Sequence, residues 1–304
     1  MIMALLRSMS REEGRLTTNT LANSASSGKV RLRRRIAGGE PARVVIFFVL
    51  LLISAVMFFP FVYMVINSFR TQQQYLQGSG FSTQSWHLLF QEMPVGTEFL
   101  NSTIVAACAI VLILIVATSA GFAFAKLRFR FHYVVFIGIV GAMMVPVQSI
   151  IIPEYVNFAR FGLINNYVSA ILTYTALGTP FATFLMTAFF RGLPDELIEA
   201  GLCDGLSYRG SFFRIALPMA LPALATVAVL QFIQIWDDFL VALLFLQSPA
   251  VRTVTVGLGV LSSGRVVGIP VLMAGSLLSA IPAVVVYLFF QRYLVTGLTL
   301  GVSR

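Results

Sequence analysis

Two glutamines and an aspartate have the types and spacing needed to bind hydroxyl groups. Gln231, Gln234 and Asp238 lie at i, i+3 and i+7, so on a helix they share one face. Amides and a carboxylate suit a polyhydroxylated solute, and the ring of Trp236 can stack on its C–H groups. The alternative is that the glutamines bridge neighbouring helices while Trp236 anchors a membrane interface. The candidate set also includes Asp237, Asn67, Tyr155 and Tyr174.

Residues that could support catalysis or nucleotide binding do not form a usable group. Asp237 and Asp238 are adjacent, so on one helix their side chains diverge by about 100°. The two lysines, Lys29 and Lys126, do not stand in a Gly-Lys-Ser/Thr sequence that cradles phosphates. The sequence therefore predicts no enzyme, no metal and no cofactor on this chain, and any ATP must bind to another chain.

The segment from 191 to 214 combines helix signals with charged residues. Pro194 suits a first helical position, and Asp195 and Glu196 complement the positive end of the helix dipole. Gly205 is a natural helix terminator. These signals predict a helix of about ten residues, from Pro194 to Gly205, outside the apolar segments.

The faces of this predicted helix are unequal. Leu197, Ala200 and Gly201 lie at i, i+3 and i+4, so they share a side where small residues let another surface approach closely. Glu199 and Asp204 flank that side as candidate anchors. The physical features alone favour a plainer interpretation, an amphipathic connector resting on the membrane surface.

The elements that carry these residues must lie in lipid. Of the 304 residues, 58% are hydrophobic and 11% are charged, whereas soluble domains contain about a quarter charged residues. Apolar segments of spanning length run from Val44 to Ile66, Phe99 to Phe124, Tyr133 to Ile152, Tyr167 to Phe190, Ile215 to Trp236, and Val271 to Phe290. A shorter stretch, Phe239 to Leu246, either lengthens the fifth helix or re-enters the membrane edge. We expect an all-α membrane protein with about six transmembrane helices.

Basic residues predict the orientation of these spans. If the N-terminus is inside, the inner segments hold 17 of the 21 lysines and arginines and the outer segments hold 4. Such an excess predicts that both termini are cytoplasmic. Residues 1–43 contain nine of these cations and no long apolar run, so we expect a disordered cytoplasmic tail beside anionic lipid rather than nucleic acid. The transmembrane domain then covers residues 44–304.

The centres of the six spans contain no Asp, Glu, Lys, Arg or His. Ion-coupled carriers usually place ionisable groups there, so this absence disfavours such a carrier. Prolines within or beside the spans leave two interpretations open, ordinary helix kinks or a pathway bordered by bent helices. They are Pro146, Pro153, Pro180, Pro218, Pro222 and Pro282.

Three short motifs follow one another in the charged loop: Glu199-Ala-Gly201, Asp204-Gly205 and Ile215-Ala-Leu-Pro218. Together they resemble the EAA loop of binding-protein-dependent ABC importer permeases. Gly201 stands where this family has alanine and keeps the position small. The resemblance extends from about Val44 to the C-terminus.

Other stretches resemble the carbohydrate-uptake branch of this family. They are Phe99-Leu-Asn-Ser102, Ala123-Phe-Ala-Lys-Leu-Arg-Phe129, Phe161-Gly-Leu-Ile-Asn165, Trp236-Asp-Asp-Phe239 and Phe289-Phe-Gln-Arg-Tyr293. Asp237 departs from the asparagine of that branch and adds a charge near the outer face.

The resemblance implies a MetI-like type I importer permease in a bacterial inner membrane. Its short helix would be a coupling helix that docks on an ATPase through Glu199, Ala200, Gly201, Asp204, Gly205, Leu217 and Pro218. A separate ATPase dimer would bind ATP and Mg, a second permease would complete the pathway, and an extracytoplasmic binding protein would deliver a sugar or oligosaccharide. Alternating access would then move the solute.

Other transport functions are the alternatives. The same architecture could carry glycerol 3-phosphate, a peptide or an amino acid, and an ion-coupled carrier is a more distant option. A phosphorylated solute would require Arg or Lys near the pathway, and the spans offer none.

Overall fold

The computed structural model describes residues 40–264 and 267–299, and every regular element in these ranges is a helix. The predicted disordered tail, residues 1–43, lies almost entirely outside the described residues. By its internal contacts the chain divides into two compact units, Met1–Tyr63 and Met64–Arg304. The described part of the first unit belongs to helix α2 (Glu40–Ser68), in which every side chain from Arg43 to Tyr63 is exposed. A helix that is apolar on all sides requires lipid or another apolar surface around it.

Four of the six predicted spans are single long helices. They are α2, α5 (Val95–Lys126), α8 (Tyr167–Gly192) and α15 (Ile269–Thr299). Helix α5 begins one turn before the predicted start at Phe99, so it also includes Glu98.

The third predicted span is not one continuous helix but two parts joined at a sharp bend. Helix α6 (His132–Gly141) and the short helix η1 (Ala142–Met144) end before Pro146, and α7 (Val147–Arg160) continues at 95° to them. Pro146 has no N–H to donate and forces the preceding Val145 out of the helical region, to ψ 116°. The two halves form a broken span or a re-entrant loop.

The fifth predicted span is also bent, by 71°. Its first part contains α10 (Tyr208–Ser211), the π-helix η2 (Phe212–Ala216) and α11 (Leu217–Met219), and its second part is α12 (Leu221–Trp236). The bend falls at Ala220, between Pro218 and Pro222. A proline cannot donate the helical hydrogen bond to the residue four positions earlier, which weakens the helix at this point.

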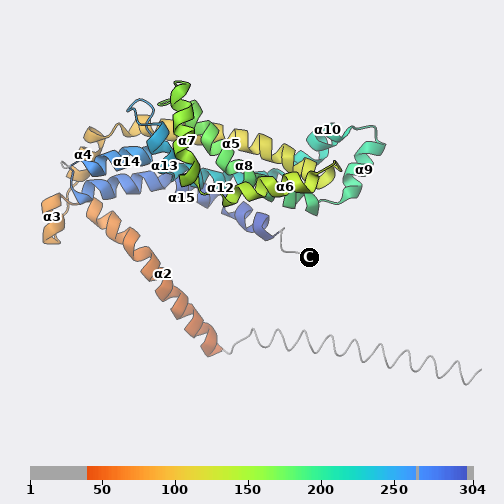
Figure 1. Ribbon diagram of the computed structural model, residues 1–304. Coiled ribbons are helices and arrows are strands. Elements are labelled where there is room, and N and C mark those ends of the chain that lie inside the picture. The colour runs from red at the N-terminus through yellow and green to blue at the C-terminus, as the bar shows by residue number, and fades with distance from the viewer. Residues whose placement is uncertain (1–39, 265–266, 300–304) are drawn as a thin grey trace, which may run out of the picture. The chain divides into compact units, whose positions relative to one another are not determined.

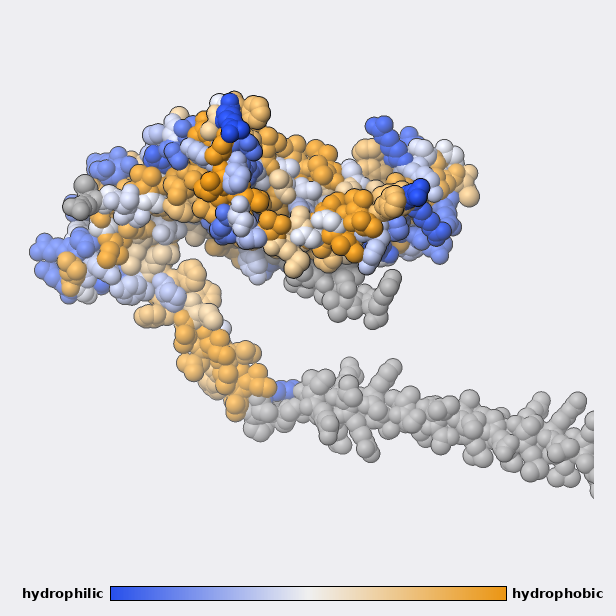
Figure 2. Space-filling view, in the orientation of Figure 1, coloured by the Kyte–Doolittle hydropathy of each residue, from blue (hydrophilic) through white to orange (hydrophobic). Residues whose placement is uncertain are grey.

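Short helices lie at the two ends of the second unit (Figure 1). Near one end are α3 (Gln72–Gln77), α4 (Gln84–Glu92) and α14 (Val254–Ser263), and at the other end are α9 (Asp195–Cys203) and α10. The apolar stretch 239–246 forms a separate helix, α13 (Leu240–Phe245), and therefore does not lengthen the fifth helix. Hydrophobic residues cover α6, whereas hydrophilic residues gather around α3 and around α9 and α10 (Figure 2).

The core of the second unit is the long contact between α5 and α8. Both helices bury small side chains in the same hydrophobic cluster, including Ala106, Ala109 and Ala117 of α5 and Ala170 and Ala182 of α8. Lipid tails are as apolar as the helices, so close backbone packing rather than burial from water holds such helices together.

Gly121 lies where α5 and α8 approach each other closely. A Cβ at this position would lie 2.7 Å from Met186 Cβ and 2.9 Å from the backbone nitrogen of Thr187. Gly121→Ala is expected to destabilise the protein by about 1–3 kcal/mol, because the two helices must separate. The thermal unfolding midpoint in detergent measures this effect.

Gly138→Ala provides the matched control. A Cβ there meets no atom within 4 Å, so the midpoint should hold or rise slightly. Equal midpoints for the Gly121 variant and the unchanged protein would contradict the close packing.

Candidate functional site

The charged loop contains the predicted short helix, α9. It runs from Asp195 to Cys203, one residue later than predicted, because Pro194 has a non-helical ψ of 135° and is the N-cap. Gly205 ends the helix as predicted, with φ of 86°. The N–H of Leu206 donates to the Gly201 carbonyl at 2.9 Å, which satisfies one of the last helical carbonyls.

The structure separates the three residues that the spacing grouped on one face. Leu197 and Ala200 are exposed, but Gly201 is buried. A Cβ on Gly201 would lie 2.7 Å from Ile215 Cδ1 and 3.1 Å from Ser211 Oγ. The small size of Gly201 therefore allows α9 to pack against α10 and η2 of the same chain. Of the three residues, Leu197 and Ala200 remain exposed on the surface of α9.

The remaining predicted docking residues lie in two places along the loop. At α9, three of them are exposed: Glu199 on the helix, and Asp204 and Gly205 just after its end. Leu217 and Pro218 begin α11, beyond the π-helix, where Leu217 is half-buried and Pro218 exposed. The loop thus passes from α9 directly into the bent fifth span.

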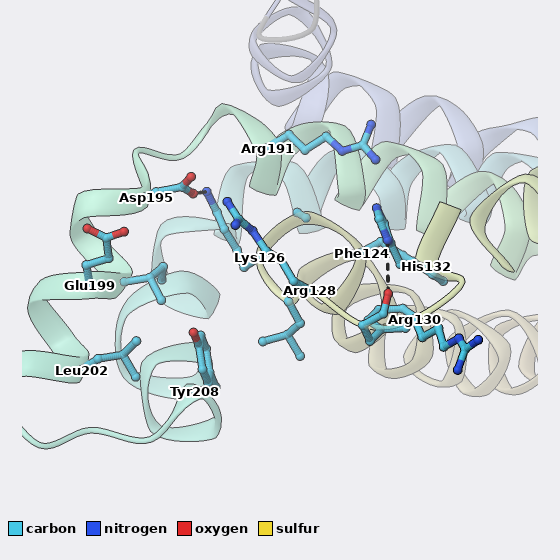
Figure 3. A pocket seen from close by; sticks show the side chains of 14 residues that line it. Phe124, Lys126, Arg128, Arg130, His132, Arg191, Asp195, Glu199, Leu202 and Tyr208 are labelled. Carbon is cyan, nitrogen blue, oxygen red and sulfur yellow. Dashed lines mark hydrogen bonds and ion pairs between the residues drawn. The ribbon is translucent and has the colours of Figure 1, made fainter. Parts of the chain in front are cut away.

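A cavity of about 1200 Å³ lies beside α9 (Figure 3). Cationic side chains from α5, from α8 and from the loop after α5 face it: Lys126, Arg191, Arg128 and Arg130. The Lys126 ammonium is 2.5 Å from Asp195 Oδ1 and donates to the Leu193 carbonyl at 2.6 Å. The hydrogen bond and charge of Lys126 hold the pKa of the exposed Asp195 carboxyl below its ordinary value. Asp195 therefore stays charged at neutral pH.

A second cavity, of about 640 Å³, lies between α8, α12 and the broken third span. Gln231, Gln234 and Asp238 all line it, but α12 ends at Trp236, so Asp238 lies beyond the helix on which the common face was predicted. Tyr174 of α8, another of the sequence candidates, lines it as well. Four of the eight solute-pathway candidates are thus brought together.

Hydrogen bonds fix the orientation of the polar groups in this second cavity. The Tyr174 hydroxyl and the Val241 N–H both donate to Asp238 Oδ1, each at 2.9 Å. Gln231 is 1% exposed, and its Nε2 is 3.5 Å from the Gly178 carbonyl. A Cβ on Gly178 would be 2.5 Å from Gln231 Oε1, so only glycine leaves room for this side chain. Gln231 therefore fits both sequence interpretations: it lines the cavity, as a solute-binding residue would, and it also bridges α12 to α8.

The other four candidates lie elsewhere. Trp236 is 3% exposed, donates from Nε1 to the Ser279 carbonyl at 2.9 Å and stacks on Phe232, so it belongs to the packing of α12 on α15. Asn67 accepts a hydrogen bond from Arg70. Tyr155 packs near Phe245, and Asp237 is exposed outside the lining of the cavity.

Sequence reasoning assigned no role to two residues of the Phe99-Leu-Asn-Ser102 stretch. Asn101 donates to the Ala250 and Arg252 carbonyls at 3.1 and 2.8 Å and accepts from the Tyr167 hydroxyl at 2.7 Å. Ser102 Oγ accepts from the N–H of Val254 at 3.0 Å. These bonds attach residues 250–254, which lead into α14, to the start of α5.

Glu98 was also missed. Its side chain is fully buried, with Arg252 Nη1 at 3.9 Å, and its carboxylate lies against Gly257, where no Cβ would fit. The position just before an apolar run could have indicated a capping carboxylate, but its partner is far away in sequence.

The family comparison decides which class of protein has this loop and cavity. Residues 109–299 match the family "Binding-protein-dependent transport system inner membrane component". The chain belongs to this family. It is a permease subunit of an ABC importer, a multi-pass membrane transport component and not an enzyme, within a complex that includes an ATPase and a binding protein.

Individual relatives match the sequence of this chain along most of their length. The osmoprotective compounds uptake permease GgtD of Synechocystis is 33% identical, over 83% of this chain and 89% of the relative. The diacetylchitobiose uptake permease NgcG of Streptomyces coelicolor is 27% identical, over 84% and 87%. The melibiose/raffinose/stachyose import permease MelC of Bacillus subtilis is 26% identical, over 83% and 94%.

A solved structure supports the fold. This chain superposes with a TM-score of 0.71 on a chain of a bacterial ABC transporter involved in the import of the acidic polysaccharide alginate. The match covers 84% of this chain and 98% of the other, at 21% identity. The predicted all-α importer permease fold is confirmed.

Asn101→Ala tests the attachment at the start of α5. The change leaves the Tyr167 hydroxyl and two carbonyls without their partner, so we expect a loss of about 2–4 kcal/mol and faster proteolysis within residues 247–253. Limited proteolysis and thermal unfolding in detergent measure both effects. Thr103→Ala is the control, because its hydroxyl is exposed and bonds only to Phe99 of its own helix. Equal cleavage rates in the two variants would contradict the role of Asn101.

Proposed function

We propose that this permease imports a sugar or oligosaccharide, and that α9 is the coupling helix on which a partner ATPase acts. The observation that carries the proposal is the position of α9. It lies at one end of the second unit and packs through Gly201 on the segment that enters α12, while α12 and α8 line the cavity of about 640 Å³. Motion of α9 would therefore be transmitted through this segment and along α12 to the cavity.

The chemistry of the cavity supports a neutral, hydroxyl-rich solute. Amides, a phenol and a carboxylate line it beside apolar surface, and its described lining contains no lysine, arginine or histidine. Hydroxyls need both donors and acceptors, which these groups provide. A phosphorylated solute would meet the Asp238 carboxylate without a compensating cation, so glycerol 3-phosphate is disfavoured. NgcG and MelC, two of the relatives, are named for saccharides.

The assembly follows from family membership and the loop. A second permease would cover the open side of the cavity, and two ATPase subunits would bind ATP and Mg and pull on the coupling helices. Docking would use the exposed Leu197, Glu199, Ala200 and Asp204. Gly201, Gly205, Leu217 and Pro218 would shape the loop and join it to the fifth span. An extracytoplasmic binding protein would deliver the solute at the other face.

The proposed orientation places α9, the N-terminus and the C-terminus in the cytoplasm of a bacterial cell. The concentration of lysine and arginine in the segments on that side supports it. The ATPase then meets α9 where ATP is available.

Ala200→Phe tests docking. Ala200 is exposed, so a large side chain should leave the fold intact but keep α9 from seating on the ATPase. We expect ATP-dependent uptake to fall at least about tenfold at unchanged membrane insertion, as for a clash at the centre of an interface. Radiolabelled solute uptake measures the effect.

Ala159→Phe, at an exposed alanine in the last turn of α7, is the matched control and should retain uptake. Co-purification of the ATPase with each variant completes the test. Full uptake by Ala200→Phe would rule out docking through this face of α9.

Gln234→Ala tests the cavity. Gln234 is exposed to it, so the variant should fold, and loss of one hydrogen bond should raise the solute concentration for half-maximal uptake about two- to tenfold. Gln291→Ala, an exposed glutamine on α15 outside the cavity, serves as the control. Unchanged concentration dependence in the Gln234 variant would place the solute elsewhere.

A further inference from the structure

Lys126 is a buried cation at the last residue of a long apolar helix. Its side chain is only 4% exposed. A buried ammonium group requires acceptors, and two are present, the Leu193 carbonyl at 2.6 Å and Asp195 Oδ1 at 2.5 Å. Charge-assisted hydrogen bonds of this length are among the stronger polar interactions in proteins.

The two acceptors lie on either side of Pro194, in the turn that joins α8 to α9. Lys126 therefore connects the end of α5 with the start of α9, as Figure 3 shows. Leu193 lies one residue beyond α8, which is itself packed along α5. Three helices thus meet at one ammonium group.

The opposite end of α9 has a different attachment. There, Gly201 packs against Ile215 and Ser211, which precede the bend into α12. A short helix held at one end can pivot about that end, whereas a helix held at both ends must move with the elements to which it is attached.

We propose that Lys126 is a positioning residue that ties the start of α9 to α5 and α8, so that force applied to α9 moves these spans. The proposal rests on the proposed docking role of α9. Without Lys126, α9 would still dock through its exposed face, but it would turn about the Gly201 contact. Part of each ATP-driven movement would then fail to reach the cavity.

The burial of Lys126 distinguishes it from an ordinary surface ion pair. Exposed pairs contribute little, because water and salt screen them and both side chains lose freedom. Here only Asp195 is exposed, and the second acceptor is a backbone carbonyl that cannot rotate away. Removal of Lys126 should therefore have a larger effect than neutralisation of Asp195.

The test uses the complete importer, with its partner permease, ATPase and binding protein, in proteoliposomes. The readout is the number of ATP molecules hydrolysed for each solute moved, a ratio that simple loss of folded protein does not change. Lys126→Met, which fills the same space without charge, should raise this ratio at least about threefold through loss of charge-assisted bonds. Asp195→Asn should raise it less, and the double variant should match Lys126→Met, because both substitutions remove one linkage.

Arg128→Met is the matched control, since Arg128 lines the same cavity but is exposed. Its ratio should equal that of the unchanged protein. A Lys126→Met complex with the unchanged ratio, or with hydrolysis and uptake reduced equally, would overturn the proposal. If the Lys126→Met complex does not assemble, Asp195→Ala replaces it, because Asp195 is exposed. Its ratio of ATP hydrolysed to solute moved must then be higher than that of Arg128→Met, and equal ratios would overturn the proposal. Failure of the docking role would instead appear as full uptake by Ala200→Phe.

Discussion

In lipid, helices gain nothing by hiding apolar side chains from one another, so the bundle depends on close contact between backbones. The contact between α5 and α8 satisfies this constraint with alanines and with Gly121, whose missing side chain lets the two helices meet. Polar groups are then concentrated where the helices end. At one end of α5, Asn101 holds the segment that leads into α14, and at the other end Lys126 holds the start of α9. Helix α5 thus makes specific hydrogen bonds to other segments near both of its ends.

In the proposed function, this arrangement would let motion of a partner ATPase reach the membrane-spanning helices. The breaks at Pro146 and Ala220 divide two spans into shorter rigid pieces around the cavity of about 640 Å³. Rigid pieces that meet at fixed bends can rotate without loss of their internal hydrogen bonds, which lipid would not replace. The break at Pro146 borders the cavity through Val145 and Val147, whereas the bend at Ala220 lies at the other end of α12 from the polar groups.

Composition and spacing were sufficient to predict the helices and the shared face of Gln231 and Gln234, because both follow from local periodicity. Asp238 lines the same cavity from beyond the end of α12, where helical spacing no longer applies. The break at Pro146 was not predictable as such, since a proline in a span produces either a kink or a full break according to its neighbours. Spacing grouped Gly201 with Ala200 on one face of α9 but could not show that Gly201 is buried while Ala200 is exposed. The contacts of Lys126 were not predicted, because its partners are 67 and 69 residues away in sequence.

The fit between Gly178 and Gln231 has a consequence for the solute range of the proposed cavity. Any side chain at 178 would occupy the space of the Gln231 amide, so these two positions act as a single steric unit. A larger residue at 178 would require a shorter one at 231, and the cavity would exchange an amide for hydrocarbon. Redesign of this side of the proposed cavity for a different solute therefore requires changes in α8 and α12 together.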